Sequence, residues 1–316
     1  MYDYPERSFE LQAEIHGHES IRSPFGISRY IAPSSRAFMD NAPFRQLKHG
    51  PWTIEGYSRA AVQTCWRINE LKIGFDLGAQ PWDFMNTPCF WLSHTHMDHV
   101  AALAVYVSRR RMMKMDPPTI YVPLYAVETI QHMLKAFSRL DRGRLPVELV
   151  GVEAGQEIEL TRELVVTVHE TKHTIPSLGY IVWERRKKLK PEYLSLAGHE
   201  IRDLKNQGIE ITREVRLPLI GYTGDTAPAG LDNNPDFYQT QVLITEMTFV
   251  APGHRKEKIH KHGHTHLDDF VARQHEFKNE LIIASHFSTR YTDRQVERWV
   301  RKSLPDMLNG RLHLWQ

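Results

Sequence analysis

The segment Leu92–His99 concentrates side chains that bind metal ions. Its residues His94, His96, Asp98 and His99 follow the spacing H-x-H-x-D-H. Packing does not require this pattern, and imidazoles and a carboxylate so close together would repel or titrate unfavourably unless a cation lay among them. Imidazole nitrogen combined with carboxylate oxygen suits a borderline divalent ion such as zinc. The spacing predicts that His94 and His96 converge on one ion and that Asp98 and His99 reach a second. The alternative is a solvated histidine-rich loop.

Three further residues that can bind metal stand just beyond apolar runs that are typical of strands. They are His173, Asp225 and His286. Ligands at the ends of separate strands fit a single site along one edge of a layered structure. Each residue also has a simpler interpretation: His173 as a hydrogen-bonded histidine, Asp225 as a turn residue next to glycine, and His286 as a partner of Asp293 or a solvated ring.

The distribution of apolar residues predicts an α/β fold from Pro51 onward. Helices outside β-rich layers, with candidate ligands at strand ends, indicate a layered sandwich with its site along one edge. The first 50 residues show no sustained period, and His16 and His18 are interpreted as surface-loop residues. The predicted strands are 61–66, 71–77, 90–92, 119–123, 164–169, 179–183, 217–222, 242–247, 281–285 and 311–315, and the predicted helices are 100–113, 126–140, 267–277 and 292–304.

Composition places the chain among ordinary globular proteins. It has 316 residues, of which 41% are hydrophobic and 25% charged, so a sizeable core is available. The net charge of +2 argues against a polybasic nucleic-acid coat protein, and the two cysteines are too few for a disulfide framework. No leader pattern and no bilayer-spanning apolar run are recognised. We therefore expect a soluble cytoplasmic protein with no membrane partner, in which residues 1–316 form a single domain and residues 1–50 are an irregular N-terminal extension.

Four strings carry a more specific resemblance. They are SHTHMDH at 93–99, KHTIPSLGY at 172–180, YTGDT at 222–226 and SHFSTRY at 285–291. Together they resemble the metallo-β-lactamase superfamily and, more narrowly, the ribonuclease Z family. Two further strings, 114–120 and 204–212, resemble its short plant and cyanobacterial branch, and the resemblance runs from about Tyr57 to about Trp299. The fold that it implies is an αββα sandwich with the metal site along one edge of the two sheets.

The resemblance also implies a two-metal hydrolytic centre. It implies two Zn²⁺ ions per subunit, with Mn²⁺ or Fe²⁺ as alternatives because mixed nitrogen and oxygen ligands accept them too. Asp225 would bridge the ions, and a bridging hydroxide would be the nucleophile. The implied ligand sets are His94, His96 and His173 for one ion, and Asp98, His99 and His286 for the other.

Cleavage of RNA also requires a proton donor, because a ribose 3′ oxygen must leave. Gly263-His264 resembles a Gly-His segment of the family, which makes His264 the candidate donor and Glu246 the residue that orients and charges its ring. Asp98 is expected to be catalytic as well as a ligand. Asp76 is interpreted either as a turn acid or as a residue that orients a ligand histidine. The same segment contains other histidines that could instead be surface residues: His254, His260, His262 and His266.

The implied activity is removal of the 3′ trailer of precursor tRNA by a homodimer. The sequence lacks the Pro-x-Lys-x-Arg-Asn string and the Gly/Pro-rich arm of many family members. Its charged stretch 183–216 is predicted to be helical and, like Arg109–Arg111, is interpreted as a solvated face, with phosphate contact as the alternative. Two other functions stay open. One is a small-molecule hydrolase acting on a cyclic phosphodiester, lactone or thioester. The other is a non-catalytic RNA-binding scaffold, which is disfavoured because no ligand is missing.

Overall fold

The computed structural model describes residues 44–316 of the chain. Its strands are β1 (Arg45–His49), β2 (Trp52–Arg59), β3 (Gln63–Ile68), β4 (Ile73–Leu77), β5 (Cys89–Trp91), β6 (Thr119–Pro123), β7 (Glu148–Val152), β8 (Glu157–Glu159), β9 (Leu164–Thr171), β10 (Ser177–Leu189), β11 (Thr212–Tyr222), β12 (Val242–Glu246), β13 (Leu281–Ser285) and β14 (Leu312–Leu314). Its α-helices are α1 (Met97–Val100), α2 (Leu103–Met112), α3 (Val127–Leu140), α4 (Gly198–Asn206), α5 (Pro228–Asp232), α6 (Lys256–Lys261), α7 (Leu267–Arg273), α8 (Asp293–Ser303) and α9 (Pro305–Gly310).

The strands form two sheets that repeat one arrangement. The first sheet has seven strands in the order β1 to β7, and the second has seven in the order β14 back to β8. In each sheet the first four strands in sequence pair antiparallel, as in β1–β2 and β8–β9. The last four pair parallel, as in β4–β5 and β13–β14. Each half of the chain therefore supplies one mixed sheet.

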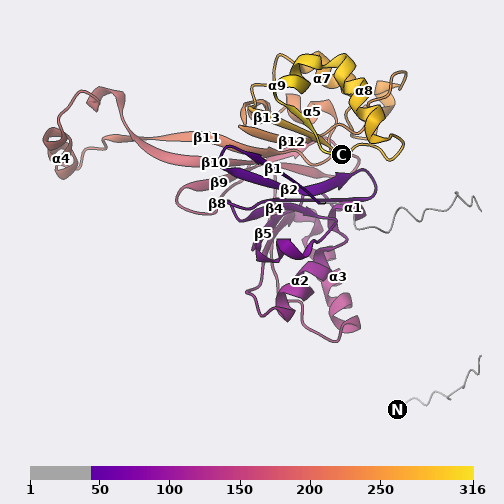
Figure 1. Cartoon of the computed structure of the whole chain (residues 1–316). Helices are drawn as coiled ribbons and strands as arrows, with labels where there is room; N and C mark the ends of the chain where they lie inside the picture. Colours follow the sequence, from indigo (N-terminus) through magenta and orange to yellow (C-terminus); the bar gives the residue numbers. More distant parts are fainter. Residues whose placement is uncertain (1–43) are drawn as a thin grey trace, which may run out of the picture. The chain divides into compact units, whose positions relative to one another are not determined.

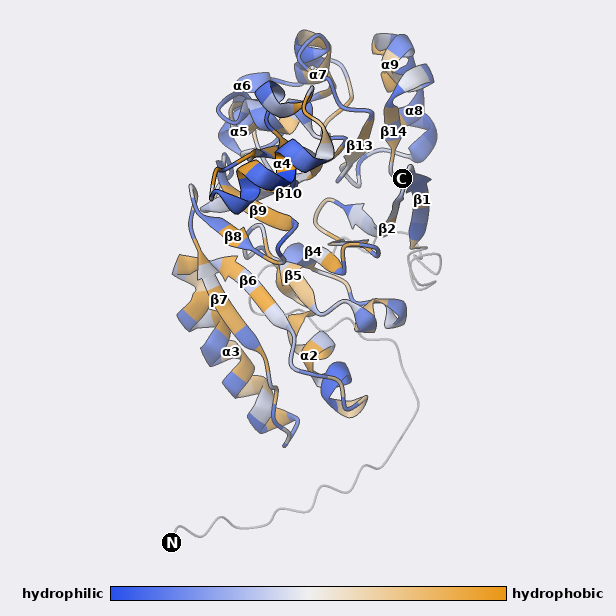
Figure 2. Cartoon of the chain, turned by 90° about the vertical axis from the view of Figure 1, so that its left-hand side faces the viewer, coloured by the Kyte–Doolittle hydropathy of each residue, from blue (hydrophilic) through white to orange (hydrophobic). Residues whose placement is uncertain are grey.

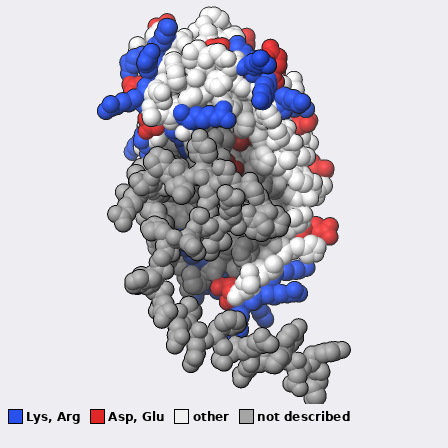
Figure 3. Space-filling view, turned by 90° about the vertical axis from the view of Figure 1, so that its right-hand side faces the viewer, with Lys and Arg blue, Asp and Glu red and all other residues white. Residues whose placement is uncertain are grey.

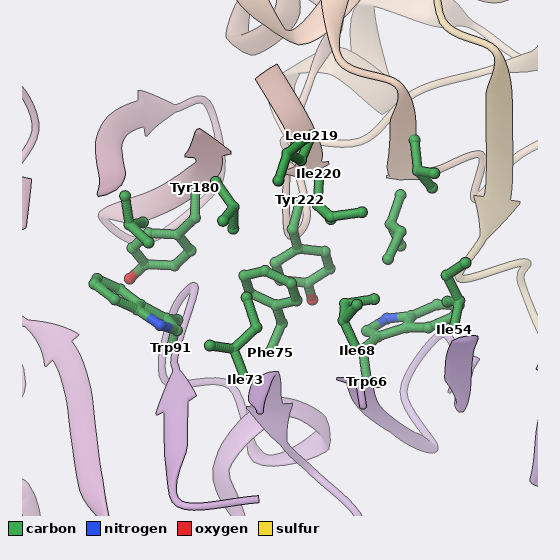
Figure 4. Close-up of a cluster of buried hydrophobic side chains, with 14 of the residues drawn as sticks. Ile54, Trp66, Ile68, Ile73, Phe75, Trp91, Tyr180, Leu219, Ile220 and Tyr222 are labelled. Carbon is green, nitrogen blue, oxygen red and sulfur yellow. The ribbon is translucent and has the colours of Figure 1, made fainter. Parts of the chain in front are cut away.

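Helices cover the outer faces of the two sheets, which pack against each other (Figure 1). The core between the sheets contains large aromatic side chains such as Trp66, Phe75 and Tyr222, all of them buried (Figure 4). A second core lies between the first sheet and helices α2 and α3, and a third between the second sheet and helices α5, α7, α8 and α9. These four layers confirm the predicted αββα sandwich. Within residues 44–316, no helix combines the length and the apolar character needed to cross a membrane.

Most predicted elements are present, with boundaries that differ by a few residues. The predicted helix 100–113 is instead two helices, α1 and α2, because the chain breaks at Ala102, whose N–H donates to the carbonyl oxygen of Leu77. The prediction of irregular structure up to residue 50 is wrong at its end, where β1 pairs with β2. His16, His18 and the rest of 1–43 lie outside the described residues. The described residues 44–316 belong to one compact unit, whereas the single-domain assignment of the whole chain stays a prediction.

The prediction of a helical stretch at 183–216 is also wrong. β10 and β11 continue through it as a long hairpin, and only α4 at its tip is helical. Beyond Glu184 the strand β10 has lost β9 as a neighbour and pairs with β11 alone, so the hairpin projects from the sheet as an arm (Figure 1). The helix α4 at its tip is largely hydrophilic and has no buried residue (Figure 2).

The central parallel strands end at one edge of the sandwich. β4, β12 and β13 have every residue buried, because layers cover both faces of their sheets. Buried strands of this kind are near-continuous apolar runs, which is why the sequence predicts them. The polar residues Asp76, Glu246 and Ser285 occur at or next to their carboxyl ends. Polar side chains from several distant segments of the chain therefore lie together at this edge.

Candidate metal centre

The segment that follows β5 brings four of the predicted ligands together. β5 ends three residues before His94, and α1 places Asp98 in its first turn. His94 and His99 are completely buried, whereas His96 and Asp98 are partly exposed. Complete burial of imidazole rings requires partners for their nitrogens. Those partners come from the second half of the chain.

Three histidine nitrogens converge on a first position. Nε2 of His94 and Nε2 of His173 each lie 3.1 Å from Nδ1 of His96. His173, in the loop after β9, donates its Nδ1–H to the carbonyl oxygen of Gly263, so its Nε2 carries a lone pair. Close approach of nitrogens that are not charged favours a cation between them. The three rings thus offer one face to a single ion.

A second position lies between two histidines and two carboxylates. Nε2 of His286 is 3.5 Å from Oδ2 of Asp98 and 3.3 Å from Oδ2 of Asp225. The same oxygen of Asp225 lies 3.5 Å from Nε2 of His99 and 3.9 Å from Nε2 of His94. Asp225 therefore faces both positions, as a bridging carboxylate would. All seven predicted ligands lie in these two clusters; their function as ligands stays a prediction.

The donor set fits divalent cations. Nε2 of His99 and Nε2 of His286 are buried atoms without a hydrogen-bond partner, which an ion would supply. Burial and the neighbouring His99 lower the pKa of His94 well below its usual value, so this ring is neutral. Burial opposes ionisation of Asp98, but the neighbouring His286 and His99 outweigh it and lower the pKa of this carboxyl to about 2. A neutral imidazole and an ionised carboxylate are the forms that bind metal.

One buried carboxylate holds the ring of His99, a predicted ligand, from the side away from the second position. Asp76, completely buried at the end of β4, accepts the Nδ1–H of His99 at 2.7 Å. It also accepts hydrogen bonds from the backbone N–H of Ser93 at 2.7 Å, from the Ser93 hydroxyl at 2.8 Å and from the Tyr222 hydroxyl. Since Asp76 fixes the tautomer of His99 with Nε2 free to bind metal, the orienting interpretation applies rather than that of a simple turn acid. The sequence did not indicate that Ser93 and Tyr222 contact this carboxylate.

The turn between β2 and β3 holds Asp98 in the same way. The backbone N–H of Ala61 donates to Oδ2 of Asp98 at 2.9 Å. Ala61 has φ +59, in the left-handed region that residues other than glycine rarely adopt. Close approach also explains Gly78, where a Cβ would lie 1.7 Å from the carbonyl oxygen of Asp98. These backbone contacts leave no trace in side-chain chemistry, so sequence reasoning missed them.

The predicted proton donor faces both clusters. His264 places Nδ1 3.0 Å from Oε1 of Glu246, and its ring centroid is 5.0 Å from that of His173 and 5.8 Å from that of His286. Burial opposes protonation of His264, but the buried Glu246 carboxylate outweighs it and raises the pKa to about 9. The hydroxyl of Thr248 lies 3.0 Å from Nδ1 of His286. Protonated His264 can therefore present a hydrogen on Nε2.

Three of the four neighbouring histidines have other partners. His260 pairs with Asp269 at 2.9 Å, and His266 lies 2.8 Å from the carbonyl oxygen of Ala251. His254 contacts the hydroxyl of Tyr291 at 2.8 Å. Within the described residues, His264 is the member of this group whose imidazole pairs with Glu246. The geometry thus separates the candidate donor from its neighbours.

Comparison with known proteins adds a family to this geometry. The family model "Beta-lactamase superfamily domain" matches residues 91–287. The tRNase Z TRZ1 of Arabidopsis thaliana is 37% identical over 263 residues, covering 83% of this chain and 94% of that protein. The chloroplastic tRNase Z TRZ2 of the same plant is 31% identical over 310 residues, covering 94% of this chain and 88% of that protein. The solved structure of the metallo-beta-lactamase fold protein YhfI from Bacillus subtilis has a TM-score of 0.58 and 12% identity, and it covers 84% of this chain and 97% of that one.

The solved structure shows a shared fold, whereas the plant relatives show closer kinship. The family model covers more than half of the chain, and the two plant proteins align with most of both chains. Both the superfamily and the narrower family expected from the four strings are confirmed. The chain therefore belongs to the ribonuclease Z (tRNase Z) family of enzymes within the beta-lactamase superfamily of hydrolases.

Proposed function

We propose that this chain is a metal-dependent endoribonuclease that removes the 3′ trailer of precursor tRNA. The observation that carries the proposal is the arrangement of two ligand clusters that share Asp225 and are faced by the His264–Glu246 pair. The names of its plant relatives, tRNase Z, support the choice of substrate. The compartment stays a prediction, since relatives include a chloroplastic and a nuclear protein.

In this proposal the two clusters hold two divalent ions, with zinc as the expected metal and manganese or iron as alternatives. Bound ions would supply a hydroxide nucleophile and offset the negative charge on the phosphoryl oxygens. Asp225 keeps the two positions together, and Asp76 and the Ala61 amide hold His99 and Asp98 in place. The ligands are His94, His96 and His173 at one position, and Asp98, His99 and His286 at the other.

His264 supplies the proton for the leaving ribose 3′ oxygen. The Glu246 carboxylate keeps the ring protonated and directs Nε2 away from itself, toward the side of the ligand clusters. Glu246 is itself fixed by the backbone N–H groups of Thr226, at 2.6 Å, and Thr265, at 3.1 Å. General acid catalysis of this kind contributes roughly 10²–10⁴-fold. Glu246 therefore acts through His264 as a positioning residue.

The projecting arm is the proposed contact for the body of the tRNA. Its arginines near the sheet are held by carboxylates, as in Arg185 with Glu159 at 2.5 Å and Arg216 with Glu157. Beyond them, three lysines in or next to the outer part of β10 have no ion-pair partner within the described residues, and we call them the arm lysines. They are Lys187, Lys188 and Lys190. Unpaired cations on a projecting hairpin suit a phosphate backbone. In the proposed homodimer, one subunit's arm presents the RNA to the other's cleft.

One experiment tests this function. Protein loaded with Zn²⁺ is incubated with a precursor tRNA that carries a 3′ trailer and, separately, with bis(p-nitrophenyl) phosphate. We expect removal of the trailer, and loss of this activity on chelation and in His96→Ala. The control Asp232→Asn loses an ion pair with Arg273 but has no hydrogen bond or ion pair with a predicted ligand, so it should cleave normally. Turnover of the small diester without any cleavage of the tRNA would instead establish a small-molecule hydrolase.

A further inference from the structure

A shared wall divides the cleft beside the ligand clusters into two cavities. The residues that line both are His96, Phe249, His264 and Arg290. The first, the His173 cavity, has a volume of about 610 Å³ and extends from His173 to α6. The second, the Asp98 cavity, has a volume of about 660 Å³ and extends along Asp98 and His286 to the β2–β3 turn. A substrate that crosses the ligand clusters would therefore enter both cavities.

Phe249 is the aromatic member of this wall. Its backbone is fixed on both sides, because its N–H donates to Thr265 O at 3.2 Å and its carbonyl oxygen accepts from Leu267 N at 2.8 Å. The ring contacts the core of the second sheet but stays partly exposed, so it lines the cleft as well. It lies 6.1 Å from the ring of His264, centroid to centroid. A rigid, partly exposed aromatic ring next to the proton donor is a surface on which a nucleobase can stack.

Cations surround the His173 cavity without carboxylate partners. Arg255, Lys258 and Arg290 line it, are exposed and form no ion pair within residues 44–316. The adjacent Lys256, by contrast, pairs with Asp268 at 3.3 Å and does not line the cavity. The helices over the second sheet form the upper part of the molecule in Figure 1, and groups of Lys and Arg side chains stand on that part of the face in Figure 3. Unpaired cations beside an aromatic surface suit a phosphate joined to a stacked base.

We propose that the His173 cavity is a subsite for one unpaired nucleotide next to the scissile phosphate. Phe249 stacks on its base, and Arg255 and Lys258 bind the phosphate on its far side. The inference rests on the proposed RNA-cleaving function and adds to it the residues that hold the strand. Stacking is tolerant of base identity, because every base has an aromatic face. The subsite therefore recognises an unpaired nucleotide rather than a particular base.

A double-mutant cycle tests the stacking. Wild-type protein and Phe249→Leu are each assayed on three RNAs. The first is an intact precursor tRNA, the second has an abasic nucleotide immediately before the cleavage position, and the third has one immediately after it. We expect Phe249→Leu to lower kcat/KM for the intact RNA between about 5-fold and about 150-fold, the equivalent of roughly 1–3 kcal/mol per stacked base. With the abasic nucleotide on the side that occupies the cavity, the same substitution should change kcat/KM less than about 2-fold. Phe249→Tyr, which keeps the ring, should retain the activity.

The outcomes separate this inference from the function on which it rests. Wild-type protein that cleaves no RNA overturns both. Cleavage of all three RNAs with the same loss in Phe249→Leu means that the substitution damages the fold or the centre generally, and it overturns the stacking assignment alone. A second pair of variants tests the contact with the phosphate. Lys258→Ala should raise KM and reduce the steepness of the fall of log(1/KM) with log salt by about 1, whereas Lys256→Ala should change neither. Equal effects of the two lysine variants overturn the phosphate assignment.

Discussion

Replacement of Asp76 by asparagine isolates the orienting network from the ligands themselves. The carboxylate accepts hydrogen bonds from His99, Ser93 and Tyr222, and all of these donors are buried. Asparagine has nearly the same shape, and its tolerance of positive φ suits the value of +55 at this position. Its amide, however, has only one oxygen. In either orientation its NH₂ group meets a donor, which costs about 1–3 kcal/mol in a buried site.

His99 can relieve this conflict by moving its proton from Nδ1 to Nε2. That proton would occupy the nitrogen lone pair that is predicted to bind metal, so the relief weakens the second position. Loss of such an outer partner typically lowers metal affinity about 10-fold to 100-fold, or about 1.4–2.7 kcal/mol. We therefore expect Asp76→Asn to bind one of its two ions this much more weakly, while His94, His96 and His173 keep the other.

Competition with a chromophoric zinc chelator measures both affinities in the absence of substrate. Tyr222→Phe removes one donor and leaves the carboxylate, so its affinity should fall less than that of Asp76→Asn. Asp232→Asn is the matched control, because this exposed carboxylate also accepts from Tyr238 and Arg273 but contacts no ligand. Two ions bound by Asp76→Asn with wild-type affinity, in protein with an unchanged circular dichroism spectrum, would refute the reasoning.

Three more variants test other parts of the structure. Glu246→Gln removes the charge that raises the pKa of His264 to about 9. Because the His264 ring of the variant loses its proton at a lower pH, the basic limb of the pH–kcat profile should move to lower pH. An unmoved limb would contradict this assignment. Alanine at all three arm lysines should weaken binding of precursor tRNA. It should also reduce the steepness of the fall of log K with log salt, where K is the association constant, by about 1 for each phosphate that the arm no longer neutralises, as measured by filter binding at several salt concentrations. Gly78→Ala places a Cβ against the carbonyl oxygen of Asp98 and should lower both the melting temperature and the zinc content, whereas unchanged values would mean that the chain can yield there.

The ligand clusters are largely predictable from the sequence because their members follow local rules. Four candidate ligands lie within residues 94–99, where spacing alone brings their side chains close together. His173, Asp225 and His286 could be added because each stands just beyond a strand, and the ends of such strands meet at one edge. The fold class follows from the same strands, since completely buried parallel strands appear as unbroken apolar runs.

The orienting contacts are not predictable in this way. Tyr222 and Asp76 are 146 residues apart, and they meet only because the two sheets pack face to face. Ala61 acts through a backbone N–H that depends on its positive φ, and alanine at that position gives no sign of it. Contacts of this kind depend on tertiary structure, which periodicity and spacing do not report.

The arm was misinterpreted for a different physical reason. A strand within a sandwich alternates between buried and exposed residues, and this alternation identifies it. Residues 185–189 of β10 pair with residues 212–216 of β11 alone, and most of their side chains are exposed. Without a buried face there is no alternation, and a run of Lys and Arg is equally compatible with a helix. The strand conformation of this segment therefore depends on the pairing of β10 with β11, which the local sequence does not indicate.

The proposed metal positions also link the two halves of the chain. Each position takes two ligands from the first half and one from the second, and Asp225 of the second half faces both. A bound ion therefore holds the two sheets together, and at 100 times its Kd it would stabilise the folded state by about 2.7 kcal/mol. Tyr222 joins this centre to the core, because its ring stacks on Phe75 at 4.8 Å while its hydroxyl donates to Asp76. The packing of the sheets and the orientation of the ligands are thus one structural property, so a change that loosens the core should weaken metal binding without touching a ligand.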